Sequence, residues 1–169
     1  MSIALIYSGT PFFPTPQPCS SALDEHLPPE GGAYLCRGQA ELIILAAQFA
    51  YEQGTPLNRS ITIHWELAGV PDSRSAQQIG AFLKIAADRI KYWGGEFCAI
   101  WVRENGIRND GRPSGSHVHI VAHVPPCLQQ RFIQHQRRWL GGLSVGGRYM
   151  KRMLKSRPVD GCSLTDGRT

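Results

Sequence analysis

The segment from 97 to 124 constrains the fold of this 169-residue chain most, because it has the pattern of a β-hairpin. Phe97 to Val102 is an apolar and aromatic run, and His117 to Val124 is a second strand pattern that ends at two prolines. The polar loop between them, Asn105 to Ser116, is rich in Gly, Asn, Asp and Pro. We therefore expect two adjacent antiparallel strands with a long, exposed loop at the tip.

The segments before this hairpin predict a helix, a strand and a second helix. Arg37 to Tyr51 is apolar enough for a helix that is buried on more than one face, and Gly54 is a natural stop for it. Ser60 to Leu67 alternates apolar with polar residues, which is the period of a half-buried strand, and a Gly69 to Pro71 turn follows. The next helix begins with a Ser75…Gln78 capping box and has an apolar stripe at helical spacing: Ala76, Ile79, Phe82, Leu83, Ala86 and Ile90.

Two further helices are predicted after the hairpin. One begins near Leu128 and ends at Gly141-Gly142, and a short one covers Arg148 to Lys155. The resulting order of elements predicts an α+β domain, an antiparallel sheet covered by helices on one face. Residues 1–32 hold six prolines and no sustained apolar period, so we expect an irregular leader there, a single domain over 33–157 and a flexible tail over 158–169.

Composition sets the broad class of the chain. Apolar residues make up 42% and charged residues 18%, which is ordinary for one soluble globular domain with its own core. No apolar run approaches the ~20 residues of a membrane helix, and the opening segment lacks a secretory signal, so we expect a cytoplasmic protein with no membrane partner. The five cysteines are scattered without a CxxC pair and are interpreted as free structural thiols.

Three histidines share one face of the predicted strand that begins at His117. His117, His119 and His123 lie at i, i+2 and i+6, and side chains alternate between the two faces of a strand. The first two lie roughly 6 to 7 Å apart and can converge on one ion, whereas His123 is about 13 Å from His119 and too far along the strand. Two partly exposed strand histidines with no ligand are the alternative.

An acidic residue can complete such a site from the neighbouring strand. Glu104 closes the strand before the histidines, where the hairpin could bring its carboxylate beside His117 and His119. Imidazole and carboxylate ligands together suit Mg²⁺ or Mn²⁺ as well as zinc. A solvated acid at the edge of the loop is the alternative for Glu104. His64, on the first predicted strand, could face this site or only fill the sheet surface, and we favour the second interpretation.

Basic residues are concentrated at the C-terminal end of the chain. From Cys127 onward there are nine Lys or Arg and two Asp or Glu, a net charge of +7, while the part before Cys127 carries −2. Such a distribution suits a surface that binds a polyanion, although a solvated basic tail is also possible. The candidate DNA contacts are Arg137, Arg138, Arg148, Lys151 and Lys155.

One tyrosine lies within this basic segment. On a helix over 148–155, Tyr149 and Arg152 would lie one turn apart on the same face. A cation there lowers the pKa of the phenol and stabilises a phosphotyrosyl adduct. Tyr149 is therefore a candidate catalytic nucleophile with Arg152 as its partner, and an anchor of an amphipathic helix is the alternative.

Together these motifs resemble the replication-initiator (Rep) branch of the HUH endonuclease superfamily. Ile61 to Leu67 is similar to its early strand motif, His117-Val118-His119 matches its His-hydrophobic-His motif, and Tyr149-Met150-Lys151-Arg152 approximates its Tyr-x-x-Lys motif with Arg in place of Lys. Glu104 corresponds to the acidic metal ligand. The resemblance spans about 61–155 and matches the single-tyrosine members, because one tyrosine follows the histidines.

The resemblance implies an RRM-like palm and a specific reaction. A site- or structure-specific nickase would cut single-stranded or hairpin DNA with the help of a divalent ion, Mg²⁺ or Mn²⁺, leaving a 5′-phosphotyrosyl enzyme and a free 3′-OH. Such proteins initiate rolling-circle replication or transposition of plasmids and other mobile elements. Two alternatives stay open, a metal-dependent hydrolase that uses activated water and a DNA-binding module without catalysis.

Overall fold

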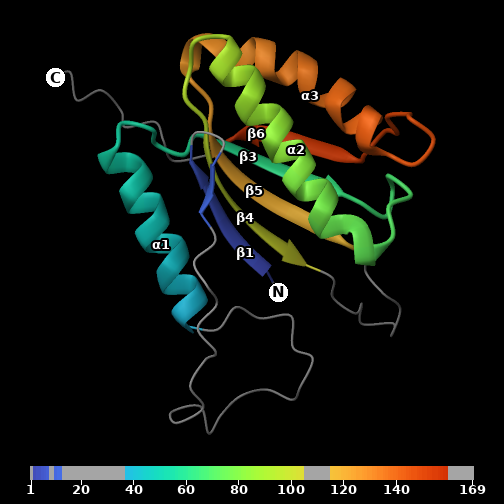
Figure 1. The fold of residues 1–169 in the computed structure, drawn as a ribbon, viewed down its shortest axis with the longest axis horizontal. Helices are drawn as coiled ribbons and strands as arrows, with labels where there is room; N and C mark the ends of the chain where they lie inside the picture. Colours follow the sequence, from blue (N-terminus) through green and yellow to red (C-terminus); the bar gives the residue numbers. More distant parts are fainter. Residues whose placement is uncertain (1, 8–9, 13–36, 105–114, 160–169) are drawn as a thin grey trace, which may run out of the picture.

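The computed structural model describes residues 2–7, 10–12, 37–104 and 115–159. Within these residues the chain has an α+β fold with three α-helices and one six-stranded sheet, in the order β2-β1-β4-β5-β3-β6 (Figure 1). The strands are β1 (Ser2–Tyr7), β2 (Thr10–Phe12), β3 (Arg59–His64), β4 (Cys98–Glu104), β5 (His117–His123) and β6 (Leu154–Pro158). The helices are α1 (Arg37–Glu52), α2 (Asp72–Tyr92) and α3 (Gln129–Leu143), the last preceded by a short 3-10 helix, Pro126–Leu128.

Every neighbouring pair of strands in this sheet is antiparallel. The coarser prediction, an α+β fold with an antiparallel sheet, is therefore confirmed, and so is the hairpin of β4 and β5, while its tip over 105–114 lies outside the described residues. Four contiguous strands, β4-β5-β3-β6, carry the candidate site, and β1 and β2 extend the sheet beyond β4.

One face of the sheet is buried under α2 and α3. Alternate residues of each strand point to the same face, so Ile61 and Ile63 of β3 lie beside Ile120 and Val118 of β5. All four side chains are fully buried, as are Phe82 on α2 and Phe132 and Leu140 on α3. This is the hydrophobic core of the described residues, and we call the opposite side of the sheet the open face.

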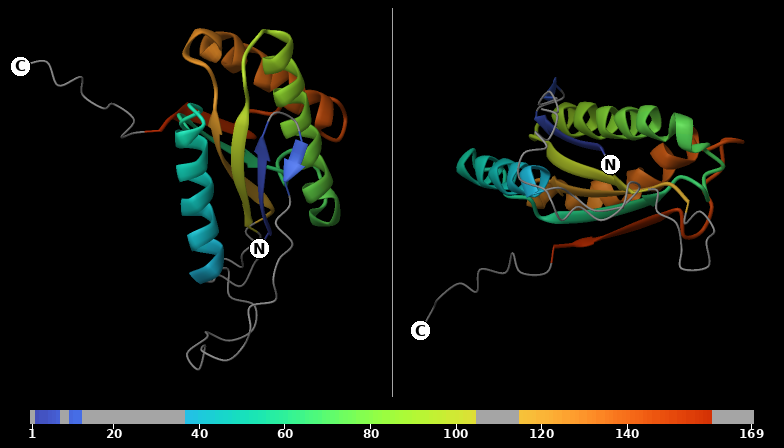
Figure 2. Two further views of the ribbon diagram at one scale, coloured as in Figure 1. Left: turned by 60° about the vertical axis from the view of Figure 1, so that its left-hand side comes forward. Right: turned by 90° about the horizontal axis from the view of Figure 1, so that it is seen from below.

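The first helix lies on the open-face side of the sheet, across from α2 and α3 (Figure 2). Its C-terminal end contacts β4, and Ala50 is the buried residue of this helix. The expectation of a helix buried on more than one face was wrong, because Ile44, Leu45 and Phe49 are exposed. The expectation of helices on one face was wrong for the same element, since α1 does not join the core under the sheet.

The prediction for the N-terminal segment, residues 1–32, was wrong in part. We expected an irregular leader over 1–32, but residues 2–7 and 10–12 form β1 and β2, and β1 pairs with β4 along its length. Apolar residues over 2–7 suit a strand, and the edge of β4 offers the hydrogen-bond partners that a short segment lacks on its own. Residues 13–36, and 160–169 of the expected tail, lie outside the described residues.

The predicted helix over Arg148 to Lys155 does not form. Residues 148–153 form neither helix nor strand, and β6 then pairs with β3 along the sheet edge. Gly146, Gly147 and Arg152 all have positive φ, which no α-helix accommodates. Good helix formers thus enter a strand because pairing with β3 outweighs their local preference.

Smaller local predictions had mixed outcomes. The helix after Pro71 and the strand near residue 60 are confirmed, although β3 ends at His64 rather than at Leu67. The capping box was wrong: Pro71 is the N-cap residue, and the Ser75 hydroxyl donates to the carbonyl of Asp72. Among the described residues, no helix is long and apolar enough to cross a membrane.

Candidate metal centre

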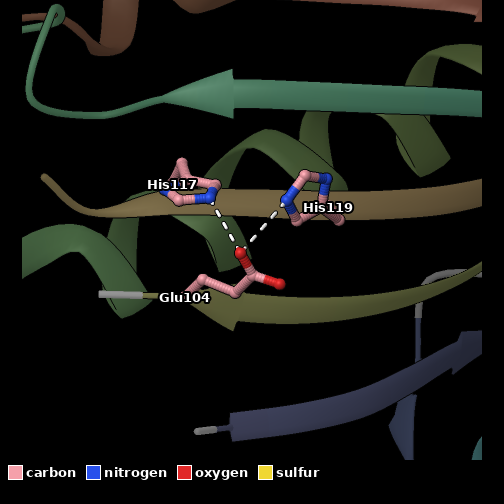
Figure 3. A group of neighbouring side chains, drawn as sticks. All are labelled: Glu104, His117 and His119. Atoms are coloured by element: carbon pink, nitrogen blue, oxygen red, sulfur yellow. Dashed lines mark hydrogen bonds and ion pairs between the residues drawn. The ribbon is translucent and has the colours of Figure 1, made fainter. Parts of the chain in front are cut away.

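The register of the β4–β5 hairpin places three candidate ligands on the open face. Glu104 is paired with His117 across the hairpin, and His119 follows two residues later on the same side of β5. Figure 3 shows the carboxylate of Glu104 between the two imidazole rings. The expectation that the hairpin brings Glu104 beside the histidine pair is met.

The distances within this group, Glu104, His117 and His119, are short enough for one shared ion. Oε2 of Glu104 lies 2.9 Å from Nε2 of His117 and 3.5 Å from Nε2 of His119 (Figure 3). One ligand atom from each residue lies within 4.8 Å of the others, so the group could hold a metal ion. The side chains of His119 and Glu104 are 46% and 37% exposed, which leaves the site open to a substrate.

Each imidazole also has an oxygen partner for its other ring nitrogen. Nδ1 of His117 lies 3.3 Å from the carbonyl oxygen of Gly115, and Nδ1 of His119 lies 3.3 Å from Oγ1 of Thr62. If each Nδ1–H donates to that oxygen, the lone pair of each Nε2 is left facing Glu104. Such an outer hydrogen bond is the usual way that proteins orient a histidine for a metal.

The ends of the two strands are anchored to neighbouring segments. The Nη1 atom of Arg103 donates to the Ser75 hydroxyl at 2.9 Å, which ties the end of β4 to the start of α2. The backbone N–H of Trp65 donates to the carbonyl of Ser116 at 2.9 Å, which fixes the residue before His117. The backbone that carries the candidate ligands is therefore anchored at both strands of the hairpin.

Two residues of β3 extend the site, and sequence reasoning did not assign either of them to it. Thr62 is paired with His119, and His64 is paired with His117. The imidazole rings of His64 and His117 are stacked, with their centres 5.6 Å apart. This position favours the alternative in which His64 faces the candidate site. Thr62 and His64 alternate with the buried Ile61 and Ile63 along the strand, which places their side chains on the open face. Only the register with β5 shows which residues they contact.

Electrostatics at His64 reflect this crowded setting. Burial lowers the pKa of His64, and the nearby imidazoles of His117 and His119 lower it further. The carboxylate of Glu66 acts in the opposite direction, and Lys155 on β6 lowers the pKa again. His64 is thus a neutral ring beside the candidate ligands near neutral pH. The positive charge of Lys155 contributes to the electrostatic potential at this ring.

The five basic residues predicted to bind DNA are distributed over both faces. Lys155 is paired with Thr62 and so lies on the open face. Arg148 and Lys151 are exposed in the turn before β6, and Arg137 and Arg138 are exposed on α3, which packs on the opposite side of the sheet. The structure therefore brings Lys155, and not the α3 arginines, to the side of the candidate metal centre.

Tyr149 packs with α3 and is not beside the candidate metal ligands. It is partly buried against the hydrophobic core, with the guanidinium of Arg137 5.8 Å from its ring centre. Its backbone lies so close to Gly141 that a Cβ there would be 3.2 Å from the nitrogen of Tyr149. The expected helical pairing with Arg152 was wrong, since Arg152 has a φ of 76° in a turn.

His123 stays outside the candidate site, as its distance along the strand predicted. It is buried, and its Nδ1 lies 2.9 Å from the carbonyl oxygen of Pro56. Nearby, burial raises the pKa of the Cys98 thiol to about 11, against the opposing effect of a hydrogen bond with Thr55. Both residues belong to the packing between the end of α1 and the sheet.

Comparison with known proteins does not identify the chain. No protein-family model, curated protein or solved structure matches it.

Proposed function

We propose that this chain is a metal-dependent endonuclease that nicks single-stranded or hairpin DNA at its open sheet face, in the manner of the HUH endonucleases that its motifs resemble. The observation that carries the proposal is the convergence of Glu104, His117 and His119, with an oxygen partner for Nδ1 of each histidine. A pair of unrelated surface histidines needs neither the carboxylate between them nor the two outer partners.

The donor set fits a divalent ion of the borderline or hard kind. Two imidazole nitrogens and one carboxylate oxygen leave further coordination positions open, and Mn²⁺ or Mg²⁺ uses such positions for water and phosphate oxygens. When bound, the ion supplies Lewis-acid polarisation of a phosphodiester. Glu104, His117 and His119 would hold it, and Thr62 and the carbonyl of Gly115 would keep the two rings in place.

The chain's own residues then position the DNA. The half-exposed ring of His119 and the carboxylate of Glu104 leave the site accessible from the open face. His64 stands against His117 as a neutral ring and adds no positive charge that would compete for the ion. Lys155 provides a cation on the same face for the negatively charged backbone.

The HUH resemblance makes a tyrosine the nucleophile. Its phenol would lose its proton as the oxygen forms a bond to phosphorus, the bond from phosphorus to the 3′ oxygen would break, and that 3′ oxygen would take up a proton. The products are a 5′-phosphotyrosyl protein and a free 3′-OH that can prime rolling-circle replication or transposition. For Tyr149 to act, the segment over 144–153 must leave its packing against α3, because the phenol needs to come within roughly 3 to 3.5 Å of the phosphorus.

A second candidate has the same ligands but a water nucleophile. The position of Tyr149 favours it, because Tyr149 packs against the hydrophobic core under α2 and α3 while the three ligands lie on the open face. Water attack would give a 5′-phosphate and a 3′-OH with no covalent adduct. The two candidates therefore share the metal centre and differ in the fate of the DNA 5′ end.

One experiment separates these outcomes. The protein is incubated with a 5′- or 3′-labelled pool of single-stranded DNA and Mn²⁺, and the products are run on a denaturing gel. Cleavage that EDTA abolishes supports the proposal, with a denaturant-resistant protein–DNA band for tyrosine attack and free 5′-phosphate ends for water attack. Cleavage that persists in EDTA, or no cleavage of any strand in the pool, contradicts the proposed endonuclease.

A further inference from the structure

We propose that the edge strand β6 binds the DNA phosphates that flank the cleavage site, through Lys155 and Arg157, and that the arginines of α3 take no part in this binding. The inference rests on the proposed function for its ligand, a single-stranded DNA backbone. It adds a defined path for that backbone across the open face, from the candidate metal ligands to the sheet edge.

The strand register places Lys155 in line with the metal centre. Lys155 is paired with Thr62, and Thr62 is paired with His119, so the three residues form one row across β6, β3 and β5. Two interstrand spacings separate the Cα atoms of Lys155 and His119, about 10 Å. The long, flexible stem of a lysine reaches over the small Thr62 between them, so its ammonium can contact a phosphate next to one held at His119.

Arg157 continues this line along the edge strand. It is two residues after Lys155 and is paired with Ser60, so both basic side chains lie on the open face, roughly 6 to 7 Å apart along β6. Both are exposed. Within the described part of the chain neither residue forms an ion pair, so their charges are available to a ligand.

The neighbouring acidic groups do not cancel these charges. Glu104 is engaged with His117 and His119 at the other side of β3 from Lys155. Glu66 raises the pKa of His64 and comes after the last residue of β3, so it lies beyond the part of β3 that pairs with β6. Two cations that form no ion pair with any described residue lie beside a candidate metal centre, which favours a polyanion whose negative charges are evenly spaced. A nucleic-acid backbone has that property.

The basic residues of α3 are in a different setting. The guanidinium of Arg131 lies 4.4 Å from the centre of the Trp93 ring, and that of Arg137 lies 5.8 Å from the centre of the Tyr149 ring. These aromatic contacts are on the helix-covered side of the sheet, where α3 packs against the core. The α3 arginines therefore lie on the helix-covered side of the sheet, whereas Lys155 and Arg157 on β6 lie on the side of the candidate ligands.

The test compares two double variants that remove the same charge from the two faces. Lys155→Gln with Arg157→Gln neutralises the edge strand, and Arg137→Gln with Arg138→Gln is the matched control on α3. Binding of a fluorescein-labelled oligo-dT strand is followed by fluorescence anisotropy over a range of NaCl concentrations, in EDTA so that no strand is cut. All four side chains are exposed, and thermal unfolding checks that both variants keep the fold.

The expected result is a change in the salt dependence that only the β6 variant shows. Loss of two phosphate contacts lowers the slope of log affinity against log salt by about 1.4, at about 0.7 per phosphate of a single strand. The α3 variant should keep the wild-type slope. An unchanged slope in the β6 variant, or an equal loss in the α3 variant, overturns the inference.

Two further arms test the ligand and separate this inference from the proposed function. A duplex of equal length and a polyglutamate peptide are titrated as competitors, and displacement of oligo-dT by either one at equal charge concentration overturns the assignment to single strands. If the wild-type protein binds oligo-dT with the predicted slope but never cuts DNA with Mn²⁺, the β6 path stands and the endonuclease proposal fails. If the wild-type protein cuts DNA while the β6 variant binds oligo-dT like wild type, the endonuclease proposal stands and the β6 path fails.

Discussion

The Nε2 atom of His117 lies 2.9 Å from Oε2 of Glu104, across a hairpin in which these two residues are directly paired. The contact is a consequence of register, because a shift of one residue on either strand would turn one of the side chains to the buried face. Pairing of β5 with β3 on its other side places His117 and His119 opposite His64 and Thr62 on the same open face. The candidate metal centre is therefore built into the middle of the sheet.

Removal of the Thr62 hydroxyl should loosen this centre without unfolding it. Thr62→Val keeps the shape but leaves Nδ1 of His119 without its oxygen partner, so we expect Mn²⁺ affinity to fall roughly 10- to 100-fold. Thr62→Ser should restore most of the affinity, since it keeps the oxygen. Ser60→Ala, two residues away on the same face, is the matched control. Wild-type affinity in Thr62→Val would show that Thr62 does not position His119.

The register explains which parts of this site the sequence could predict. His117 and His119 share a face by strand alternation alone, and the hairpin signals placed Glu104 near them. Thr62 was missed, and the position of His64 beside His117 was left undecided, because the pairing of β3 with β5 links segments more than 50 residues apart in the chain. Nothing local in either segment specifies that partner.

The C-terminal elements were missed for a related reason. Arg148 to Lys155 contains good helix formers, but hydrogen bonds with β3 hold its last residues in a strand. The edge of β4 likewise accommodates β1, in a segment whose later prolines indicated irregular structure. Tertiary pairing decided both cases, and the position of Tyr149 changed with the first of them.

Replacement of Tyr149 by Phe tests its role as nucleophile. The change removes only the hydroxyl and keeps the ring that packs against α3, so the fold and metal binding should be unchanged. If Tyr149 is the nucleophile, the covalent protein–DNA adduct disappears in the denaturing gel. An adduct that persists, or one that peptide mapping locates on another of the five tyrosines, shows that Tyr149 is not the attacking residue.

The pKa of Cys98 predicts a difference in reactivity between two cysteines. Burial raises this pKa to about 11, so the thiol stays protonated and inert at pH 8.5, whereas Cys127 is exposed. Brief treatment of the native protein with iodoacetamide should label Cys127 and spare Cys98, as read by peptide mass spectrometry. The unfolded thiol ionises first, at its ordinary pKa of 9.0, so the stability from this group is present below that pH and is lost as pH rises towards 11. Equal labelling of the two cysteines would contradict the burial of Cys98.

A core substitution tests the face of the sheet that α2 and α3 cover. Ile120 is fully buried in the central part of the sheet, so Ile120→Ala should lower the free energy of unfolding by about 2 to 5 kcal/mol in a urea titration. Ile44→Ala on α1 is the control, because Ile44 is 66% exposed and its truncation should change stability by no more than about 0.5 kcal/mol. A large loss at Ile44 would mean that α1 is covered in solution.

Titration calorimetry with Mn²⁺ tests the central claim most directly, that Glu104, His117 and His119 hold one divalent ion. Wild-type protein should bind a single ion, Glu104→Gln should bind it more weakly, and the double variant His117→Ala with His119→Ala should show no binding heat. His123 lies on the same strand but is hydrogen-bonded to the carbonyl oxygen of Pro56, so His123→Ala should keep the wild-type affinity for Mn²⁺. A double variant that is folded by circular dichroism and binds Mn²⁺ as tightly as wild type would contradict the account.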